Sequence, residues 1–231
     1  MYIITGTSTG IGKAIAEYYL EKGEKVIGIS RRNDISHENF TFLKCDFTER
    51  QQMHDLDLAS YISQSDKPVT LINNAGVIGD IKRSNEQTLT HYADLALVNL
   101  VAPQFLTSCV IQHAGFDQVD AVVFISSGAA QRPVPSWAAY CSSKAAIDMF
   151  AQTLAAEIDE LNKNTRVYSI APGIVDTNMQ KSIRNSEERN FSGKQHFVQL
   201  KENNELRSPQ EVAKLLDQFL SEKHDAVVNR L

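Results

Sequence analysis

The stretch Thr5-Gly6-Thr7-Ser8-Thr9-Gly10-Ile11-Gly12 determines the fold that this sequence predicts. It follows the apolar run Tyr2-Ile3-Ile4 and opens a segment of helical periodicity at 11–22. Glycines let the backbone turn sharply and let a phosphate approach without a Cβ in the way. The next helix N-terminus offers unpaired N–H groups and a partial positive charge. Glycine spacing alone is a weak signal. At the first strand-to-helix turn, however, it predicts a dinucleotide site rather than a turn without a ligand.

Short β-branched runs alternate with longer stretches of helical period along the rest of the chain. Parallel strands need crossover connections, and these are usually helices that cover both faces of the sheet. The sequence therefore predicts one doubly wound, Rossmann-type α/β domain over residues 1–231, with a mostly parallel seven-stranded sheet flanked by helices. Strands are expected at 2–5, 25–30, 41–45, 69–72, 121–125, 166–170 and 226–228, and helices near 11–22, 50–64, 88–113, 137–161 and 208–222.

Two regions depart from this alternation. The connection at 31–40 is too short for a full crossover helix. Residues 176–206 are polar and charged and lack a strong period. A long stretch of this kind inside a compact domain is usually a functional lid or binding loop. We therefore predict a mobile substrate lid at 176–206 that closes over bound ligands. A solvated helix-loop-helix excursion is the alternative.

Composition excludes several classes of protein. The chain has 231 residues, a formal charge of −5, and hydrophobic and charged fractions of 42% and 22%, which are ordinary values for a folded protein. The acidic balance disfavours nucleic acid and anionic membranes as partners, and no uninterrupted apolar run approaches the ~20 residues of a membrane span. The six histidines lack metal-ligand spacing. Three distant cysteines and an N-terminus without a basic region predict a cytoplasmic protein.

Further motifs follow the first turn in a fixed order. They are Asn73-Asn74-Ala75-Gly76, Asn99, Ser126-Ser127, Tyr140-Cys141-Ser142-Ser143-Lys144 and Pro172-Gly173. With the T-G-x-x-x-G-x-G spacing of the first turn, this series resembles the short-chain dehydrogenase/reductase superfamily over essentially the whole chain. The resemblance implies a nicotinamide-dependent oxidoreductase.

The residues themselves predict acid–base chemistry. Tyr140 and Lys144 stand at i and i+4, so a helix places them on one face, one turn apart. A free tyrosine, with a pKa of about 10, is a poor base at neutral pH, and a nearby ammonium lowers that pKa. Ser127 follows an apolar strand, where open α/β sheets place ligands, and can hydrogen-bond the carbonyl oxygen that Tyr140 protonates. Ser126 competes for this role, but the spacing to Tyr140 favours Ser127.

The resemblance assigns further roles. It makes Asn99, Ser127, Tyr140 and Lys144 the catalytic residues, with Lys144 also holding the nicotinamide ribose and Asn99 orienting a water in the proton relay. A polar residue at a helix kink is the alternative for Asn99. The residues expected to contact the cofactor are Gly6, Thr7, Ser8, Gly10, Ile11, Gly12, Ser30, Arg31, Arg32, Asp46, Phe47, Asn74, Ala75, Gly76, Asn99, Tyr140, Lys144, Pro172, Gly173, Val175 and Thr177.

The end of the second predicted strand indicates which cofactor is bound. An NAD-selective site usually places an acidic residue there, whereas arginine accommodates a 2′-phosphate. This chain has Ser30-Arg31-Arg32, with no acid before Asp34. A guanidinium can bind the phosphate through two hydrogen bonds. The sequence therefore predicts NADP(H) bound through Arg31, and Arg32 either assists or only caps a surface loop.

The substrate is indicated by the stretch from Ser126 to Cys141, which includes Trp137-Ala138-Ala139-Tyr140. It resembles the sepiapterin reductase branch of the family and its bacterial benzil-reductase-like members. That resemblance implies reduction of a small vicinal dicarbonyl compound, often beside an aromatic ring. A 3-oxoacyl thioester reductase or another alcohol dehydrogenase is the alternative. A non-catalytic NADP-sensing module is disfavoured because Tyr140 and Lys144 are both present.

The helices at 88–113 and 137–161 predict a homo-oligomer, most simply a dimer. Each carries apolar residues on more than one face, so each must be covered on two sides. The sheet covers one side, and a two-fold interface can cover the other. A deeply buried monomer core is the alternative. The residues concerned are Leu95, Leu97, Val98, Leu100, Val101, Ala145, Ala146, Ile147, Met149 and Phe150.

Overall fold

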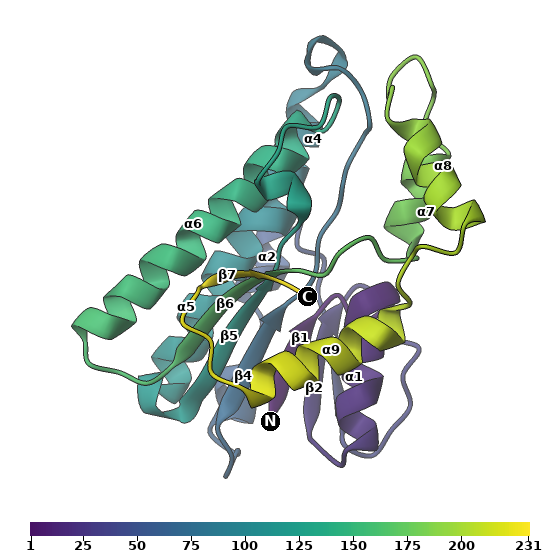
Figure 1. The fold of residues 1–231 in the computed structure, drawn as a ribbon. Coiled ribbons are helices and arrows are strands. Elements are labelled where there is room, and N and C mark those ends of the chain that lie inside the picture. Colours follow the sequence, from purple (N-terminus) through teal and green to yellow (C-terminus); the bar gives the residue numbers. More distant parts are fainter.

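The computed structural model describes residues 1–231, and Figure 1 shows a twisted sheet with helices on both faces. Its strands run in the order β3-β2-β1-β4-β5-β6-β7, and every neighbouring pair is parallel. The predicted doubly wound α/β fold is confirmed, with the change in winding direction beside β1. The strands are β1 (Tyr2–Thr5), β2 (Val26–Ser30), β3 (Phe40–Lys44), β4 (Val69–Asn73), β5 (Val119–Ile125), β6 (Arg166–Ala171) and β7 (Val228–Arg230).

Helices α1 (Gly10–Glu21) and α9 (Pro209–Ser221) cover the face of the sheet that is in front in Figure 1. Ile15 of α1 and Leu216 of α9 are fully buried and belong to one apolar cluster with Ile4 and Val123 of the sheet. The Ser208 hydroxyl accepts a hydrogen bond from the Glu211 N–H and begins α9. Helix α9 packs beside α1, and both are held against the sheet through this cluster.

Helices α5 (Ala102–Ala114) and α6 (Ala138–Glu160) cover the opposite face. Leu106 and Ile147 are buried in a second apolar cluster with Leu71 and Val122 of the sheet. Both faces of the central strands are therefore buried, as their continuous apolar sequence predicts.

One continuous helical run, Leu89–Ala114, is long and apolar enough to cross a membrane by length and composition. It consists of α4 (Leu89–Ala96), a π-helical turn η2 (Leu97–Val101) and α5. Val98, Ala102 and Val110 from this run are buried in the cluster beneath the sheet. Packing against the sheet therefore accounts for part of the apolar character of the run.

The prediction of one continuous helix near 50–64 is wrong. Two short helices form instead, α2 (Arg50–His54) and α3 (Ala59–Ile62). Between them, Asp57 accepts hydrogen bonds from the backbone N–H and the hydroxyl of Ser60. Such local bonds compete with helix continuation. Three short 3₁₀ turns complete the structure: η1 (Ser84–Glu86), η3 (Phe116–Gln118) and η4 (Gly128–Ala130).

Residues 176–206, named the lid segment below, contain α7 (Asn178–Arg184) and α8 (Lys194–Glu202). In its secondary structure the segment follows the helix-loop-helix alternative. The Thr177 side chain begins α7 by accepting a hydrogen bond from the Gln180 N–H at 3.4 Å. In Figure 1 the segment projects away from the sheet, on the side where the strands end. Its mobility stays a prediction.

Candidate active site

A cleft of about 1610 Å³ opens where the parallel strands end. Turns after β1, β2, β4, β5 and β6 all contribute to its lining, as do α6 and the lid segment. The structure thus brings most of the predicted site residues together. Those that do not line the cleft are Thr7, Gly12, Arg32 and Asn99.

The turn after β1 is held against the turn after β4 by hydrogen bonds. The Thr5 hydroxyl accepts from the backbone N–H groups of Asn74 and Ala75, both at 2.9 Å. The Asn74 side-chain amide donates back to the Thr5 carbonyl at 2.9 Å. Gly6, at φ +76°, lies so close that an added Cβ would approach Asn74 Nδ2 to 2.8 Å. Glycine is required here by both the dihedral angle and the close packing.

Thr7 and Gly12 support this turn from behind. Thr7 is 1% exposed, and its hydroxyl is 3.2 Å from that of Ser30. A Cβ at Gly12 would collide with the Asn74 side chain and the Gly6 carbonyl. Both residues therefore shape the turn without lining the cleft themselves, and their contact with the cofactor stays a prediction.

Arg31 lies at the open edge of the cleft, with its side chain 66% exposed. Its guanidinium is 4.0 Å from the Asp46 carboxylate, which is too long for a strong ion pair. The Ser30 hydroxyl donates to the Arg32 carbonyl at 2.7 Å and fixes the turn. Arg32 is exposed but does not line the cleft, so the surface-loop alternative describes it better.

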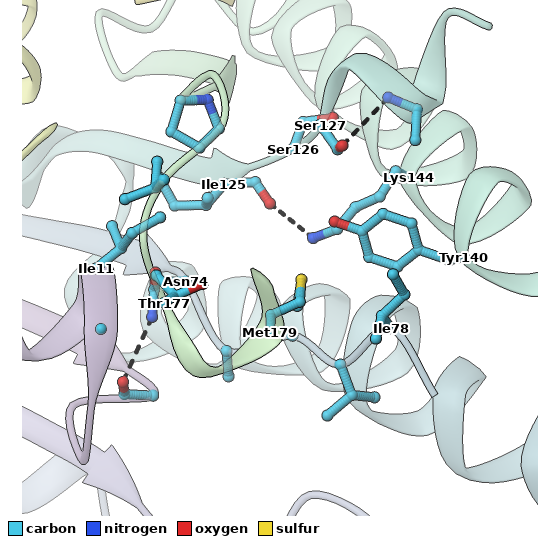
Figure 2. A pocket seen from close by; sticks show the side chains of 18 of the residues that line it. Ile11, Asn74, Ile78, Ile125, Ser126, Ser127, Tyr140, Lys144, Thr177 and Met179 are labelled. Atoms are coloured by element: carbon cyan, nitrogen blue, oxygen red, sulfur yellow. Dashed lines mark hydrogen bonds between the residues drawn. The ribbon is translucent and has the colours of Figure 1, made fainter. Parts of the chain in front are cut away.

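Tyr140 and Lys144 lie on α6 as the i, i+4 spacing predicts, and both are buried. The Lys144 ammonium donates to the Ile125 carbonyl at 2.7 Å and lies 5.8 Å from the Tyr140 ring centroid. Figure 2 shows Tyr140, Lys144 and Ser127 gathered on one side of the cavity, with Met179 and Thr177 of the lid segment across from them. The three predicted polar side chains are therefore neighbours.

The charge states differ from the sequence-based expectation that Lys144 lowers the pKa of Tyr140. Burial raises the pKa of Tyr140 above its ordinary value, and hydrogen bonding with Ser127 opposes this only in part. Burial also lowers the pKa of Lys144, to about 8, with Asp148 acting in the opposite direction. The expectation is wrong for this arrangement because burial dominates the shift of Tyr140, and Lys144, whose ammonium is bonded to the Ile125 carbonyl, is not among the groups that oppose it. Tyr140 thus keeps its proton at neutral pH.

The structure distinguishes the two adjacent serines. Ser126 is 4% exposed, and its hydroxyl donates to Asp148 at 2.6 Å. Ser127 accepts from the Ala129 N–H at 3.1 Å and lies beside Tyr140. This favours Ser127 as the substrate-facing serine. Sequence reasoning missed Asp148, although its position four residues after Lys144 places it on the same helix face.

Asn99 lies in the π-helical turn and is 1% exposed. Its amide group exchanges two 2.8 Å hydrogen bonds with the Val77 backbone and donates to Ser143 at 3.1 Å. It is not bonded to Lys144, although both side chains approach Gly76. The structure supports a polar residue at an irregular helical turn, and the water-orienting role stays a prediction.

The segment after β6 closes the cleft on another side. Gly173 takes φ +81°, and Pro172, Val175 and Thr177 line the cleft with it. The Arg207 guanidinium donates to the carbonyls of Pro172 and Leu231, at 3.1 and 2.8 Å. Sequence reasoning missed this support because Arg207 is distant in sequence from the turn that it holds.

An aromatic cluster borders Tyr140. The Trp137 ring stacks on Phe191, with centroids 5.2 Å apart, and meets Tyr140 edge-on at 5.9 Å. Phe197 lies 5.6 Å from Trp137. Phe191 and Phe197 belong to the lid segment, so this segment is buried against α6 through its aromatic residues.

Residues 1–188 match the sequence model of the short chain dehydrogenase family. The chain belongs to this family. The strand order, the first turn and the Tyr140–Lys144 pair described above are thus those of a short chain dehydrogenase, and the resemblance seen in the sequence is confirmed.

Two relatives of this short chain dehydrogenase are benzil reductases that form (S)-benzoin. The one from Bacillus subtilis is 39% identical over 218 residues, which cover 92% of this chain and 90% of the relative. The one from Bacillus cereus is 36% identical over 233 residues, covering 94% and 92%. Among solved structures, the short chain dehydrogenase/reductase YIR035C of Saccharomyces cerevisiae matches with a TM-score of 0.87 at 30% identity, covering 99% of this chain and 94% of that one.

The site of this short chain dehydrogenase fits a nicotinamide dinucleotide. Gly6 and Gly10 both have positive φ and border the cleft, and no side chain caps the N-terminus of α1. The turn therefore leaves backbone N–H groups and a helix dipole for a pyrophosphate.

Proposed function

We propose that this protein is an NADPH-dependent carbonyl reductase that transfers a hydride to a ketone, with a vicinal, benzil-like diketone as its substrate. One observation carries the proposal. Tyr140 is a buried tyrosine that keeps its proton and lines a cleft together with Ser127 and Lys144. A protonated acid beside a hydrogen-bond donor is what reduction of a carbonyl group requires.

The chain's own side chains then have distinct tasks. The Ser127 hydroxyl hydrogen-bonds the substrate carbonyl oxygen and fixes its position. Tyr140 donates its proton to that oxygen as negative charge develops there. Lys144 stands one helical turn from Tyr140, and its ammonium would hold the ribose of the nicotinamide cofactor. When bound, the reduced nicotinamide supplies the hydride.

The preference for NADPH rests on Arg31. It is a cationic side chain at the edge of the cleft, and its only acidic neighbour, Asp46, is 4.0 Å away. A guanidinium that is largely free of an ion pair is available for a 2′-phosphate. The same turn has no carboxylate at position 31 to bind a ribose 2′-OH.

The substrate class rests on the apolar lining near Tyr140. Trp137, Phe197, Met179 and Ile78 border this part of the cleft. Aromatic side chains bury large apolar area and favour stacked or edge-on contacts with other rings. The lining therefore suits a carbonyl compound with an aryl substituent, as in the benzil reductases to which the chain is similar.

A substrate panel tests the proposal. Purified protein is assayed with benzil, an aliphatic vicinal diketone, an aryl monoketone and a 3-oxoacyl thioester, each with NADPH and with NADH, by the absorbance of the reduced cofactor. We expect the highest kcat/KM for benzil with NADPH, and no activity above background for Tyr140→Phe purified in parallel. A higher kcat/KM for the thioester would support the alternative reductase, and failure to reduce any carbonyl would refute the proposal.

We further propose that the enzyme is a homodimer formed through the outer side of α5 and α6. Val101, in the π-helical turn η2 just before α5, and Met149 of α6 are apolar and 40% and 62% exposed, whereas the opposite sides of α5 and α6 are buried against the sheet. A two-fold contact between two copies would cover these side chains. Light scattering at micromolar concentration should give twice the monomer mass, and a monomer mass would contradict the proposal.

We also propose that the enzyme is located in the cytoplasm. Cys45, Cys109 and Cys141 are all unpaired, which suits a reducing compartment.

A further inference from the structure

Asp148 is a buried carboxylate at the base of the cleft. It lies on α6, one turn after Lys144 and two turns after Tyr140, and is 4% exposed. Both carboxylate oxygens accept hydrogen bonds. Ser126 and Ser169 donate to Oδ1, each at 2.6 Å, and Gln131 donates to Oδ2 at 3.0 Å. These three donors come from the end of β5, from β6 and from the segment after η4.

No arginine, lysine or histidine forms a salt bridge with this carboxylate. Burying a charge is costly unless it is compensated. Three neutral donors bond the two carboxylate oxygens of Asp148, and the nearest cation along the helix face is the ammonium of Lys144. The carboxylate and the ammonium are thus two buried charges on one face of α6, separated by one turn.

The environment of Lys144 contains few other charges. The backbone carbonyl of Ile125 accepts its hydrogen bond at 2.7 Å, and Gly76 and the uncharged Asn99 side chain adjoin it from β4 and η2. The Tyr140 ring, on the same helix, has its centroid 5.8 Å from the ammonium. Asp148 is the one charged group whose field acts on the ammonium. Asp94, Arg132 and Arg230 also border the cleft but do not shift Lys144.

The bond to Ser126 has a second consequence. The Ser126 backbone N–H donates to the Ile170 carbonyl at 2.8 Å, so the chain is still extended beside β6 at this point. Consecutive side chains of extended backbone point to opposite sides. With the Ser126 hydroxyl held by Asp148, Ser127 is directed to the other side, beside Tyr140.

We propose that Asp148 is a positioning residue of the active site: its carboxylate holds the Ser126 hydroxyl, so that Ser127 faces the substrate, and it places a buried negative charge one helical turn from Lys144. The part of this proposal that concerns the reaction rests on the proposed reductase function. The effect on Lys144 is a property of the protein itself.

The direct test is titration of Lys144 by NMR in protein with isotope-labelled lysine, where the Lys144 signal is identified by its loss in Lys144→Met. The wild-type midpoint should lie near pH 8. In Asp148→Asn, which keeps the shape and an oxygen acceptor but removes the charge, we expect the midpoint to fall by about one pH unit. Since the ammonium is lost at lower pH, the alkaline limb of the kcat/KM profile for carbonyl reduction should move downward by the same amount.

Ser169→Ala is the matched control, because it removes one hydrogen bond to Asp148 and leaves the charge. Its Lys144 midpoint should stay near that of the wild type. Ser126→Ala also keeps the charge but should lower kcat with little change in the KM for NADPH, because Ser127 is less well oriented. Thermal unfolding followed by circular dichroism verifies that each variant is folded, and Asp148→Ser replaces Asp148→Asn if that variant does not fold.

An unchanged Lys144 midpoint in the folded Asp148 variant would overturn the effect on the ammonium. An unchanged kcat in Ser126→Ala would overturn the effect on Ser127. If no carbonyl compound is reduced by the wild type, the proposed function fails while the titration can still be read, so the two failures are distinguishable.

Discussion

The two halves of the cleft are built in different ways. The half predicted to hold the cofactor consists of turns directly after β1, β2 and β4, held by bonds such as those between Thr5 and Asn74. The half predicted to hold the substrate is completed by the lid segment, which is attached through side chains. Trp137 stacks on Phe191, and the Ser136 hydroxyl donates to the Asn190 carbonyl. Changes in the lid segment alone can therefore alter the substrate preference of such a site, without altering the sheet.

Within the lid segment, Asp176 connects the two helices. Its carboxylate accepts a hydrogen bond from Lys201 of α8 at 2.6 Å and lies 3.6 Å from Arg184 of α7. The Lys201 bond holds the pKa of Asp176 below its ordinary value. We therefore expect α7 and α8 to move together as one unit when the cleft opens and closes.

The largest effect should come from Tyr140, where the two halves meet. Tyr140→Phe removes the proton donor and leaves the cofactor turns unchanged, so kcat for carbonyl reduction should fall by about 100-fold or more. NADPH affinity, measured by fluorescence, should stay within about twofold. Tyr168→Phe, which removes a buried hydroxyl outside the cleft, is the control. More than a tenth of the wild-type activity in Tyr140→Phe would mean that another group is the acid.

The next effect concerns the cofactor half alone. Arg31→Asp removes the cation and adds a charge that repels the 2′-phosphate, so the ratio of kcat/KM for NADPH over NADH should fall by about 10- to 100-fold. Arg32→Asp makes the same charge change beside the cleft and should have a much smaller effect, because Arg32 does not line it. Equal kcat/KM for both cofactors in the wild type would contradict the role of Arg31.

A smaller effect is expected in the substrate half. Trp137→Leu keeps an apolar side chain but removes the ring, so the preference for an aryl diketone over an alkyl diketone should fall by about three- to tenfold. The KM for NADPH should not change, because the cofactor turns are unaffected. An unchanged preference would show that the ring serves only to anchor the lid segment.

The smallest effect concerns opening of the lid segment. Limited proteolysis should cut within 180–200 in the free protein and should slow when NADPH and an inhibitor are bound. Asp176→Asn weakens the contact with Lys201 and Arg184, so cutting of the free variant should be a few-fold faster. Equal cutting of the wild type with and without ligands would indicate a passive surface excursion.

The contrast between the two halves of the cleft also explains which features of the structure could be predicted from the sequence. The first turn, Asn74 and the Tyr140–Lys144 pair follow from local rules, because glycine dihedrals and i, i+4 spacing need no tertiary information. Arg207, which supports Pro172, depends on segments that are distant in the sequence. The charge states of Tyr140 and Lys144 depend on burial, which spacing does not reveal. For the lid segment the sequence predicts two helices only as the alternative, because capping by Thr177 and packing on Trp137, which stabilise them, leave no strong apolar period.

The π-helical turn Leu97–Val101 makes this helix sensitive to the deletion of a single residue. Such a turn holds one residue more than regular α-helical winding needs. Deleting any one of its residues would restore that winding and would rotate one side of the helix by about 100° relative to the other. Either Leu95 or the stripe of Ala102, Leu106 and Val110 would then leave its apolar surroundings. Conservative substitutions should be tolerated along the outer side of this helix, whereas a single-residue deletion should not be tolerated anywhere within it.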